Sequence, residues 1–244
     1  MNDDSARAHY TQRDDPDSQT APAEVRRGLD EFLEQWSVDG PVLDLGSGVG
    51  GNLAPIGAHN HVVGAEISLS AAGQARHYAP VVVADGARLP FGAGVFGAVV
   101  CTEVLEHVDD PRLVFAEMAR VLRPGAVAYV TTPNYANVAG LHKWVADRRS
   151  GRHDWNPWGA HHGGYEAFMT GRQLWAAAAP YFRLERVRGL DYGQAITGRF
   201  GALDRLAWTR PGQAALGRAL PRLYRSSGRL AWHGMHIELV LRLS

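Results

Sequence analysis

The sequence has little of what stabilises proteins outside the cell or within a membrane. Cys101 is the only cysteine, so no disulfide can form within the chain, which is typical of a reducing compartment. The first residues are acidic and polar and do not resemble a signal peptide. No run of residues is apolar for long enough to be a membrane span. These absences predict a soluble, cytoplasmic protein.

The chain also has no excess of charge, because 25 Lys and Arg balance 25 Asp and Glu among its 244 residues. Proteins whose main task is to bind nucleic acid are usually basic, because phosphate neutralisation dominates their affinity. The balance therefore argues against DNA and leaves RNA as a weak alternative. With 45% apolar residues the composition is that of a globular domain. We expect a flexible N-terminal tail at residues 1–21 and one domain at residues 22–244.

Short β-branched runs alternate with helix-like stretches after a first amphipathic helix at residues 25–36. The strand-like runs are PVLDLG, HVVGAEI, PVVVAD, GVFGAVVC and AVAYVTT. This alternation predicts an α/β protein with a Rossmann-like, doubly wound parallel sheet. Two insertions, at about 134–170 and 190–232, interrupt the rhythm, and we interpret them as a cap over a substrate pocket. GRQLWAAAA between them predicts a helix, YFRLERVRGL a strand, and HIELVLRL an antiparallel edge strand.

The strongest local motif is VLDLGSGVGG, a buried strand that runs into a glycine-rich turn. Gly46, Gly48 and Gly51 satisfy the G-x-G-x-x-G pattern, so a nicotinamide-dependent oxidoreductase is one alternative. The loop contains no basic residue that could help to bind a pyrophosphate. A tight turn with no ligand at all is the other interpretation of the glycines alone.

Three acids lie at the ends of successive predicted strands. Glu66 ends the second strand, where a carboxylate can accept both hydroxyls of a ribose, and Asp85 ends the third, where it can accept an adenine amino group. Asp44 lies inside the glycine motif and could orient the loop or a ligand ammonium group. Together they suit a ligand with a cationic amino-acid portion, a ribose and an adenine, and they suit a pyrophosphate poorly.

These segments resemble, in order, the motifs of class I S-adenosylmethionine (SAM)-dependent methyltransferases: VLDLGSGVGGN, VVGAEIS, ADGARLPF, FGAVVCTEVLEH and LRPGAVAYVTTPN. The resemblance covers residues 40–134 closely and implies a seven-stranded sheet whose last strand is antiparallel. It also implies that SAM contacts a set of residues in these motifs, Cys101 through its backbone only: Gly46, Gly48, Glu66, Ile67, Asp85, Gly86 and Cys101.

A second group of polar residues follows the fourth strand in TEVLEH. On a helical turn Glu103, Glu106 and His107 would share one face, where they could hold Mg²⁺ or another divalent cation. Without a metal, His107 could act as a general base, with Glu106 beside it. The stretch resembles the E-x-x-E-H segment of ubiquinone-pathway O-methyltransferases and of small-RNA 2′-O-methyltransferases, which implies a later histidine ligand. We expect that histidine to be His162 rather than His161.

Residues 186–232 hold nine arginines and two acids, Asp191 and Asp204, so nine minus two leaves a local charge of about +7. They form either a helical cap with solvated arginines, or a surface for an anionic substrate or acidic membrane lipid, or a site for RNA.

These observations predict SAM-dependent methyl transfer to a hydroxyl of a small molecule, such as a phenol, a sugar or a quinone-like compound, with metal assistance as an option. The alternatives are N-methylation of an amino sugar or other amine, RNA 2′-O-methylation, and a SAM-binding module without catalysis. The sequence does not predict an oligomeric state.

Overall fold

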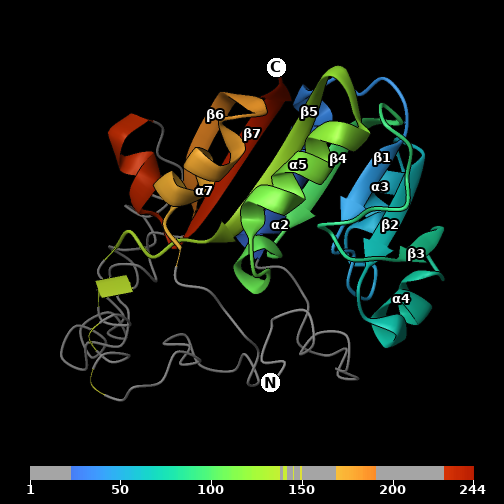
Figure 1. The fold of residues 1–244 in the computed structure, drawn as a ribbon, viewed down its shortest axis with the longest axis horizontal. Helices are drawn as coiled ribbons and strands as arrows, with labels where there is room; N and C mark the ends of the chain where they lie inside the picture. Colours follow the sequence, from blue (N-terminus) through green and yellow to red (C-terminus); the bar gives the residue numbers. More distant parts are fainter. Residues whose placement is uncertain (1–22, 138–139, 142–144, 146–148, 150–168, 191–227) are drawn as a thin grey trace, which may run out of the picture.

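The computed structural model describes residues 23–137, 140–141, 145, 149, 169–190 and 228–244 (Figure 1). The expected tail and most of the two expected insertions lie outside this part of the chain, so their predicted roles stay predictions. In the part described, one sheet is covered by helices on both faces (Figure 1).

The sheet has seven strands in the order β3-β2-β1-β4-β5-β7-β6. Strands β1 to β5 pair in parallel, whereas β7 is antiparallel to both of its neighbours. This confirms the predicted Rossmann-like α/β fold with an antiparallel last strand. The strands are β1 (Val42–Leu45), β2 (Val62–Glu66), β3 (Val81–Val83), β4 (Phe96–Thr102), β5 (Leu122–Pro133), β6 (Phe182–Leu190) and β7 (His236–Leu243).

The helices pack on the sheet in two layers, because alternate strand residues point to opposite faces. Helices α2, α3 and α4 cover the core that contains Tyr129, and α5 and α7 cover the core that contains Val130. No helix of the described residues is long and apolar enough to cross a membrane. The helices are α2 (Ala23–Gln35), α3 (Leu53–Gly57), α4 (Leu69–Ala75), α5 (Pro111–Val121) and α7 (Gly171–Ala178), with 3-10 turns η1 (Leu105–His107) and η2 (Gly228–His233).

Local capping explains where the two helices of the second layer begin. Asp110 accepts a hydrogen bond from the Arg112 backbone, with Pro111 as the first helical residue of α5. Thr170 and Gln173 form a reciprocal capping box at the start of α7. Helix α5 follows the carboxyl end of β4, and α7 begins beside the residue that follows β5. The carboxyl ends of the strands are where α/β proteins bind their ligands.

The expectation that the last strand is an edge strand is wrong. Strand β7 pairs on both sides, with β5 and with β6, and β6 is the edge strand at this side of the sheet. The polar residues that alternate in HIELVLRL suggested contact with water. Its central polar residue, Glu238, is instead fully buried and ion-paired to Arg186 and Arg188 of β6.

Candidate cofactor and acceptor site

The glycine loop after β1 has a backbone conformation that side chains would obstruct. Gly46, Gly48 and Gly50 all have positive φ, at 74°, 52° and 99°. A Cβ atom on Gly46 would overlap the side chain of Val104, which follows β4. The loop therefore packs tightly against the residue segment that follows β4. Its backbone lies between β1 and β4, where the strand order of the sheet reverses.

Glu66 holds this loop in place. Its Oε2 accepts a hydrogen bond from the Gly48 backbone at 2.9 Å, and its Oε1 accepts one from the Ser68 backbone at 2.8 Å. Burial raises the pKa of Glu66, although these bonds act in the opposite direction. Each oxygen has lone pairs beyond these bonds, so the carboxylate could also accept ligand hydroxyls.

Asp44 is fully buried inside β1, and one of its oxygens is unsatisfied. Asn52 donates to Oδ1 over 3.4 Å, whereas Oδ2 has no hydrogen-bond partner among the described residues. Burial, the largest effect, raises the pKa of Asp44 to about 7. A buried carboxylate oxygen without a donor is costly, and a cationic ligand would satisfy it. The site thus fits the amino-acid portion of SAM by its chemistry.

Asn52 contacts the candidate site, and our sequence reasoning did not single it out. Its Nδ2 also donates to the Thr102 hydroxyl at 2.9 Å, so the side chain connects the loop of β1 to the end of β4. The signal was present, because Asn52 is the last residue of VLDLGSGVGGN.

The predicted adenine side of the site lies after β2 and β3. Asp85 follows β3 by two residues, and its Oδ1 accepts from the Ala87 backbone at 2.9 Å. Gly86 lies against Leu45, since a Cβ there would be 3.4 Å from the Leu45 Cδ1 atom. Ile67 directly follows Glu66 and is half-buried. The segments after β1, β2 and β3 therefore meet at one end of the sheet.

Cys101 is fully buried in β4, and burial raises the pKa of its thiol well above the usual value. A buried, protonated thiol is unreactive. The predicted role of Cys101, a backbone contact only, is compatible with this environment.

The segment from Glu103 to His107 is not the single helical turn that we expected. Glu103 has a φ of 55° and precedes the 3-10 turn η1, so helical spacing does not relate it to Glu106. Glu103 accepts from the Thr131 hydroxyl and Glu106 from the Thr132 hydroxyl, both at 2.9 Å. Because Thr131 and Thr132 are neighbours in β5, they point to opposite faces of the sheet, and the two carboxylates contact different faces.

A histidine does contact Glu103, and it comes from the last strand. His236 Nε2 lies 3.3 Å from Glu103 Oε2, and both side chains are largely buried. Burial opposes ionisation of Glu103, but His236, Thr131 and His107 outweigh it, so the pKa of Glu103 lies below its usual value. The predicted partner His162 lies outside the described residues. Nothing in the sequence around His236 indicated this contact, which depends on the pairing of β7 with β5.

The histidine that we predicted as a base lies at the edge of this group. His107 Nε2 is 3.7 Å from Glu106 Oε1, and 31% of the His107 side chain is exposed, against 3% for Glu106. An imidazole that is partly exposed and oriented by a buried carboxylate can exchange a proton with a ligand.

The described residues do not form a metal site. Among them, no group of three or more His, Cys, Asp or Glu side chains could hold an ion. Glu103 and Glu106 instead each accept from a threonine of β5. Divalent metal binding stays a prediction that involves His162, and we assign no catalytic step to it.

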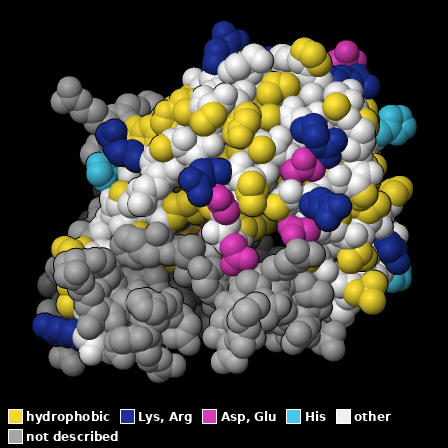
Figure 2. Space-filling model, in the orientation of Figure 1, with side chains coloured by type: hydrophobic (Ala, Val, Ile, Leu, Met, Phe, Trp, Pro, Cys, Tyr) yellow, Lys and Arg dark blue, Asp and Glu magenta, His cyan; other side chains and the backbone are white. Residues whose placement is uncertain are grey.

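Two of the nine arginines in the predicted Arg-rich segment form ion pairs within the fold. Arg186 and Arg188 belong to β6, where Arg186 pairs with Glu238 at 3.0 Å and Arg188 with Glu31 at 2.9 Å. On the face shown in Figure 2, basic and acidic side chains of the described residues lie beside one another. Residues 191–227, which contain six of the nine arginines, lie outside the described residues.

Comparisons with known proteins agree with this geometry. Residues 43–130 match a family model described as a methyltransferase domain. A demethylmenaquinone methyltransferase of Mycolicibacterium vanbaalenii is 39% identical over 124 residues, which are 48% of this chain and 54% of that protein. The chain thus spans about half the length of the curated relatives it matches.

Solved structures extend the similarity to most of the chain. A SAM-dependent methyltransferase of Thermotoga maritima is superposed with a TM-score of 0.58 at 17% identity, over 90% of each chain. A geranyl diphosphate C-methyltransferase of Streptomyces coelicolor gives 0.54 at 16% identity, over 90% of this chain and 79% of that one. At such identities the likeness establishes the fold, and a fold of this kind is compatible with many different acceptors.

Proposed function

We propose that this chain, which contains a methyltransferase domain of the class I SAM-dependent type, transfers a methyl group from SAM to a hydroxyl of a small, quinone-like phenol. The observation that carries the proposal is the unsatisfied Asp44 oxygen beside a glycine loop that Glu66 holds in place. The names of the curated relatives, demethylmenaquinone methyltransferases, support a quinone-like acceptor.

Three carboxylates would hold the cofactor. Asp44 would accept from the ammonium group, Glu66 from the ribose hydroxyls and Asp85 from the adenine amino group, while the backbone of Gly46 and Gly48 approaches the ligand closely. When bound, SAM supplies an electrophilic methyl group on a sulfonium.

The acceptor end needs a base and a fixed orientation. His107 would remove the proton of the phenol, and the buried Glu106, held by Thr132, would orient the imidazole. Glu103 and His236 would line the same end of the sheet, since His107 is close enough to Glu103 to lower its pKa.

A ring carbon of the same phenol is the second candidate for the methylated atom. A phenolate shares its charge between oxygen and the neighbouring ring carbons, so the same base would serve both reactions. The relatives' names favour a quinone nucleus without indicating the oxygen.

Cofactor binding is tested by calorimetry with SAM, S-adenosylhomocysteine and NAD. We expect Glu66→Ala and Asp85→Ala to weaken SAM binding about 10- to 100-fold, because each removes charge-assisted hydrogen bonds. Glu185→Ala, which removes an exposed carboxylate of β6, is the matched control. Unchanged SAM affinity in both site variants, or binding of NAD instead, would refute the assignment.

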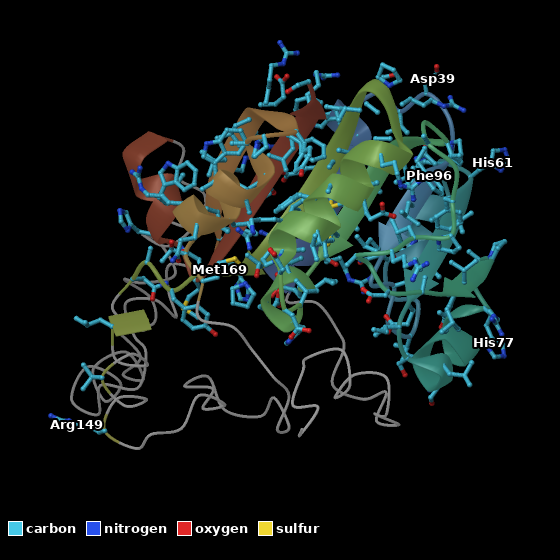
Figure 3. All side chains as sticks on the ribbon, in the orientation of Figure 1. Asp39, His61, His77, Phe96, Arg149 and Met169 are labelled. Carbon is cyan, nitrogen blue, oxygen red and sulfur yellow. The ribbon has the colours of Figure 1, made fainter. Side chains whose placement is uncertain are left out.

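The acceptor is tested with methyl-labelled SAM and reduced naphthoquinones, phenols and amines, with NMR to locate the labelled carbon on oxygen, carbon or nitrogen. We expect His107→Ala to lower turnover at least about 100-fold while SAM affinity stays within about twofold. His77→Ala is the control, because His77 is exposed at the outer end of the β1–β3 half (Figure 3). Near-normal turnover of His107→Ala would remove it as the base, and loss of activity with a chelator would favour a metal-assisted route.

A further inference from the structure

One buried side chain joins three segments at the carboxyl end of β5. Asn134 is 1% exposed. Its Oδ1 accepts from the backbone of Gly171 at 3.0 Å and of Ala136 at 3.2 Å. Its Nδ2 donates to the carbonyls of Trp232 at 3.0 Å and Gly234 at 2.9 Å. Both donors and both lone pairs of the carboxamide are therefore used.

Backbone hydrogen bonds bring further chain ends to the same place. Asn134 N donates to the Met235 carbonyl at 2.7 Å, and Met235 N donates to the Leu190 carbonyl at 2.8 Å. Tyr135 N donates to the carbonyl of Met169 at 3.1 Å, and Met169 lies where the green, orange and red segments converge (Figure 3). The ends of β5 and β6, the start of β7 and the start of α7 thus meet around Asn134.

The Gly234 carbonyl is fixed twice. Asn137 Nδ2 donates to it at 2.9 Å and also to the Asn134 carbonyl at 2.6 Å. Gly234 has no room for a side chain, since a Cβ would lie 2.6 Å from Leu190 N. The backbone two residues before His236 therefore has little freedom to move.

This restraint acts at the acceptor end of the site. His236 begins β7 opposite Pro133 and directs Nε2 to Glu103 at 3.3 Å. Thr131, three residues before Asn134, holds the other oxygen of Glu103. The contact between Glu103 and His236 therefore depends on the spacing of β5 and β7 at the point where Asn134 ties them.

We infer that Asn134 is a positioning residue for the acceptor end of the site: its carboxamide holds residues 232–235 against β5 and thereby keeps His236 in contact with Glu103. The inference rests on the proposed function. It is separate from cofactor binding, because the residues that would hold SAM by side-chain contacts lie in or after β1, β2 and β3. The Asn134 side chain bonds instead to the loop after β5, to the start of α7 and to the residues before β7.

Asn134→Asp separates the acceptor contacts of the Asn134 side chain from its donor contacts. The aspartate retains acceptors for Gly171 and Ala136, but it presents a carboxylate oxygen to the carbonyls of Trp232 and Gly234, which repel it. We expect amide hydrogen exchange at residues 232–236 to rise about tenfold or more, while exchange at residues 42–52 stays unchanged. Asn60→Asp, before β2, is the matched control.

In kinetics we expect Asn134→Asp to lower kcat/KM for the acceptor at least about tenfold, with S-adenosylhomocysteine affinity within about twofold of the wild type. A double-mutant cycle with His236→Ala tests the route of the effect. If Asn134 acts through His236, the two losses are not additive. Should the Asp variant fail to fold, Asn137→Ala, which removes one of the two donors to Gly234, should give the same pattern with smaller amplitude.

Three outcomes would overturn the inference: unchanged exchange at residues 232–236, fully additive losses in the cycle, or a loss of S-adenosylhomocysteine affinity as large as the loss of turnover. The last would show a general structural role. A wild-type protein that binds no SAM would refute the proposed function instead, and the exchange measurement would still decide whether Asn134 restrains residues 232–236.

Discussion

Asp44 and Glu238 are both fully buried carboxylates in inner strands of one sheet, and burial raises the pKa of each. Glu238 accepts from Arg186 at 3.0 Å and from the Tyr129 hydroxyl at 3.3 Å, and Arg188 lies 3.8 Å away. Asp44 has one long hydrogen bond and an oxygen without a partner among the described residues. Both acids bear a desolvation cost, and only Glu238 is compensated by ion pairs within the described part of the protein.

The compensated acid is part of the scaffold. The arginines that bind Glu238 continue to α2, where Arg186 contacts Gln35 at 2.8 Å and Arg188 contacts Glu31 at 2.9 Å. Gly28 allows α2 to approach, since a Cβ there would lie 2.6 Å from a Glu238 oxygen. The acid with complete partners fixes a helix, whereas we propose the acid with an unsatisfied oxygen as a ligand contact.

The largest effect that would test this contrast is expected from Glu238→Gln. The change leaves Arg186 without its buried counter-charge and Arg188 with Glu31 alone, and we expect a loss of about 3 kcal/mol of unfolding free energy. Urea unfolding measures the loss. A variant as stable as the wild type would mean that the arginines find other partners, and that the network does not hold α2.

Asp44→Asn should affect ligand binding rather than stability. We expect SAM binding to weaken about 10- to 100-fold, with no loss of unfolding free energy near pH 8. The pKa of Asp44 in the folded chain, about 7, exceeds its ordinary value of 3.8. The folded chain therefore binds this proton more tightly than the unfolded chain, and wild-type stability falls as the pH rises from about 4 to about 7.

The asparagine variant lacks that pH-dependent loss. For the same reason SAM affinity of the wild type should rise between about pH 6 and pH 8, as Asp44 ionises to meet the ammonium group. Calorimetry and thermal unfolding at both pH values measure these effects. Equal pH dependence in the two proteins would show that Asp44 is not the group responsible.

Tyr129→Phe tests a weaker partner of the buried Glu238. The hydroxyl donates to Glu238, and it also lies 3.3 Å from the Val25 carbonyl of α2. We expect a loss of about 1 kcal/mol, because Glu238 keeps its arginines. The loss should largely vanish in the Glu238→Gln background, and an undiminished loss there would argue that the two side chains act independently.

The smallest effect is expected from Glu185→Gln, which removes an ion pair of similar geometry from the surface. Arg242 Nε lies 3.0 Å from Glu185 Oε1, but about a third of each side chain is exposed. We expect a change of less than about 0.5 kcal/mol in urea unfolding. A loss comparable to that of Glu238→Gln would mean that burial is not what distinguishes the two pairs.

The local structure of the proposed cofactor half was predictable because its signals are short. The turn after β1 requires glycines at Gly46 and Gly48, and Glu66 directly ends a β-branched run, so each residue was identified within its own segment. The acceptor half was predicted less well. Glu103 and Glu106 look like helical neighbours in the sequence, but Glu103 has a positive φ and precedes the 3-10 turn, and the two carboxylates accept from different threonines of β5.

The chain's own pattern of β-branched runs, glycines and strand-end acids was sufficient to determine an α/β fold and the residues around its first loop, because those features depend on neighbours within a few positions. Tertiary structure alone decided that β7 lies inside the sheet, that Arg186 and Arg188 neutralise a buried acid, and that Glu103 meets His236. Each of these contacts arises from pairing between strands that are distant in the sequence, and no local periodicity encodes which strands will pair.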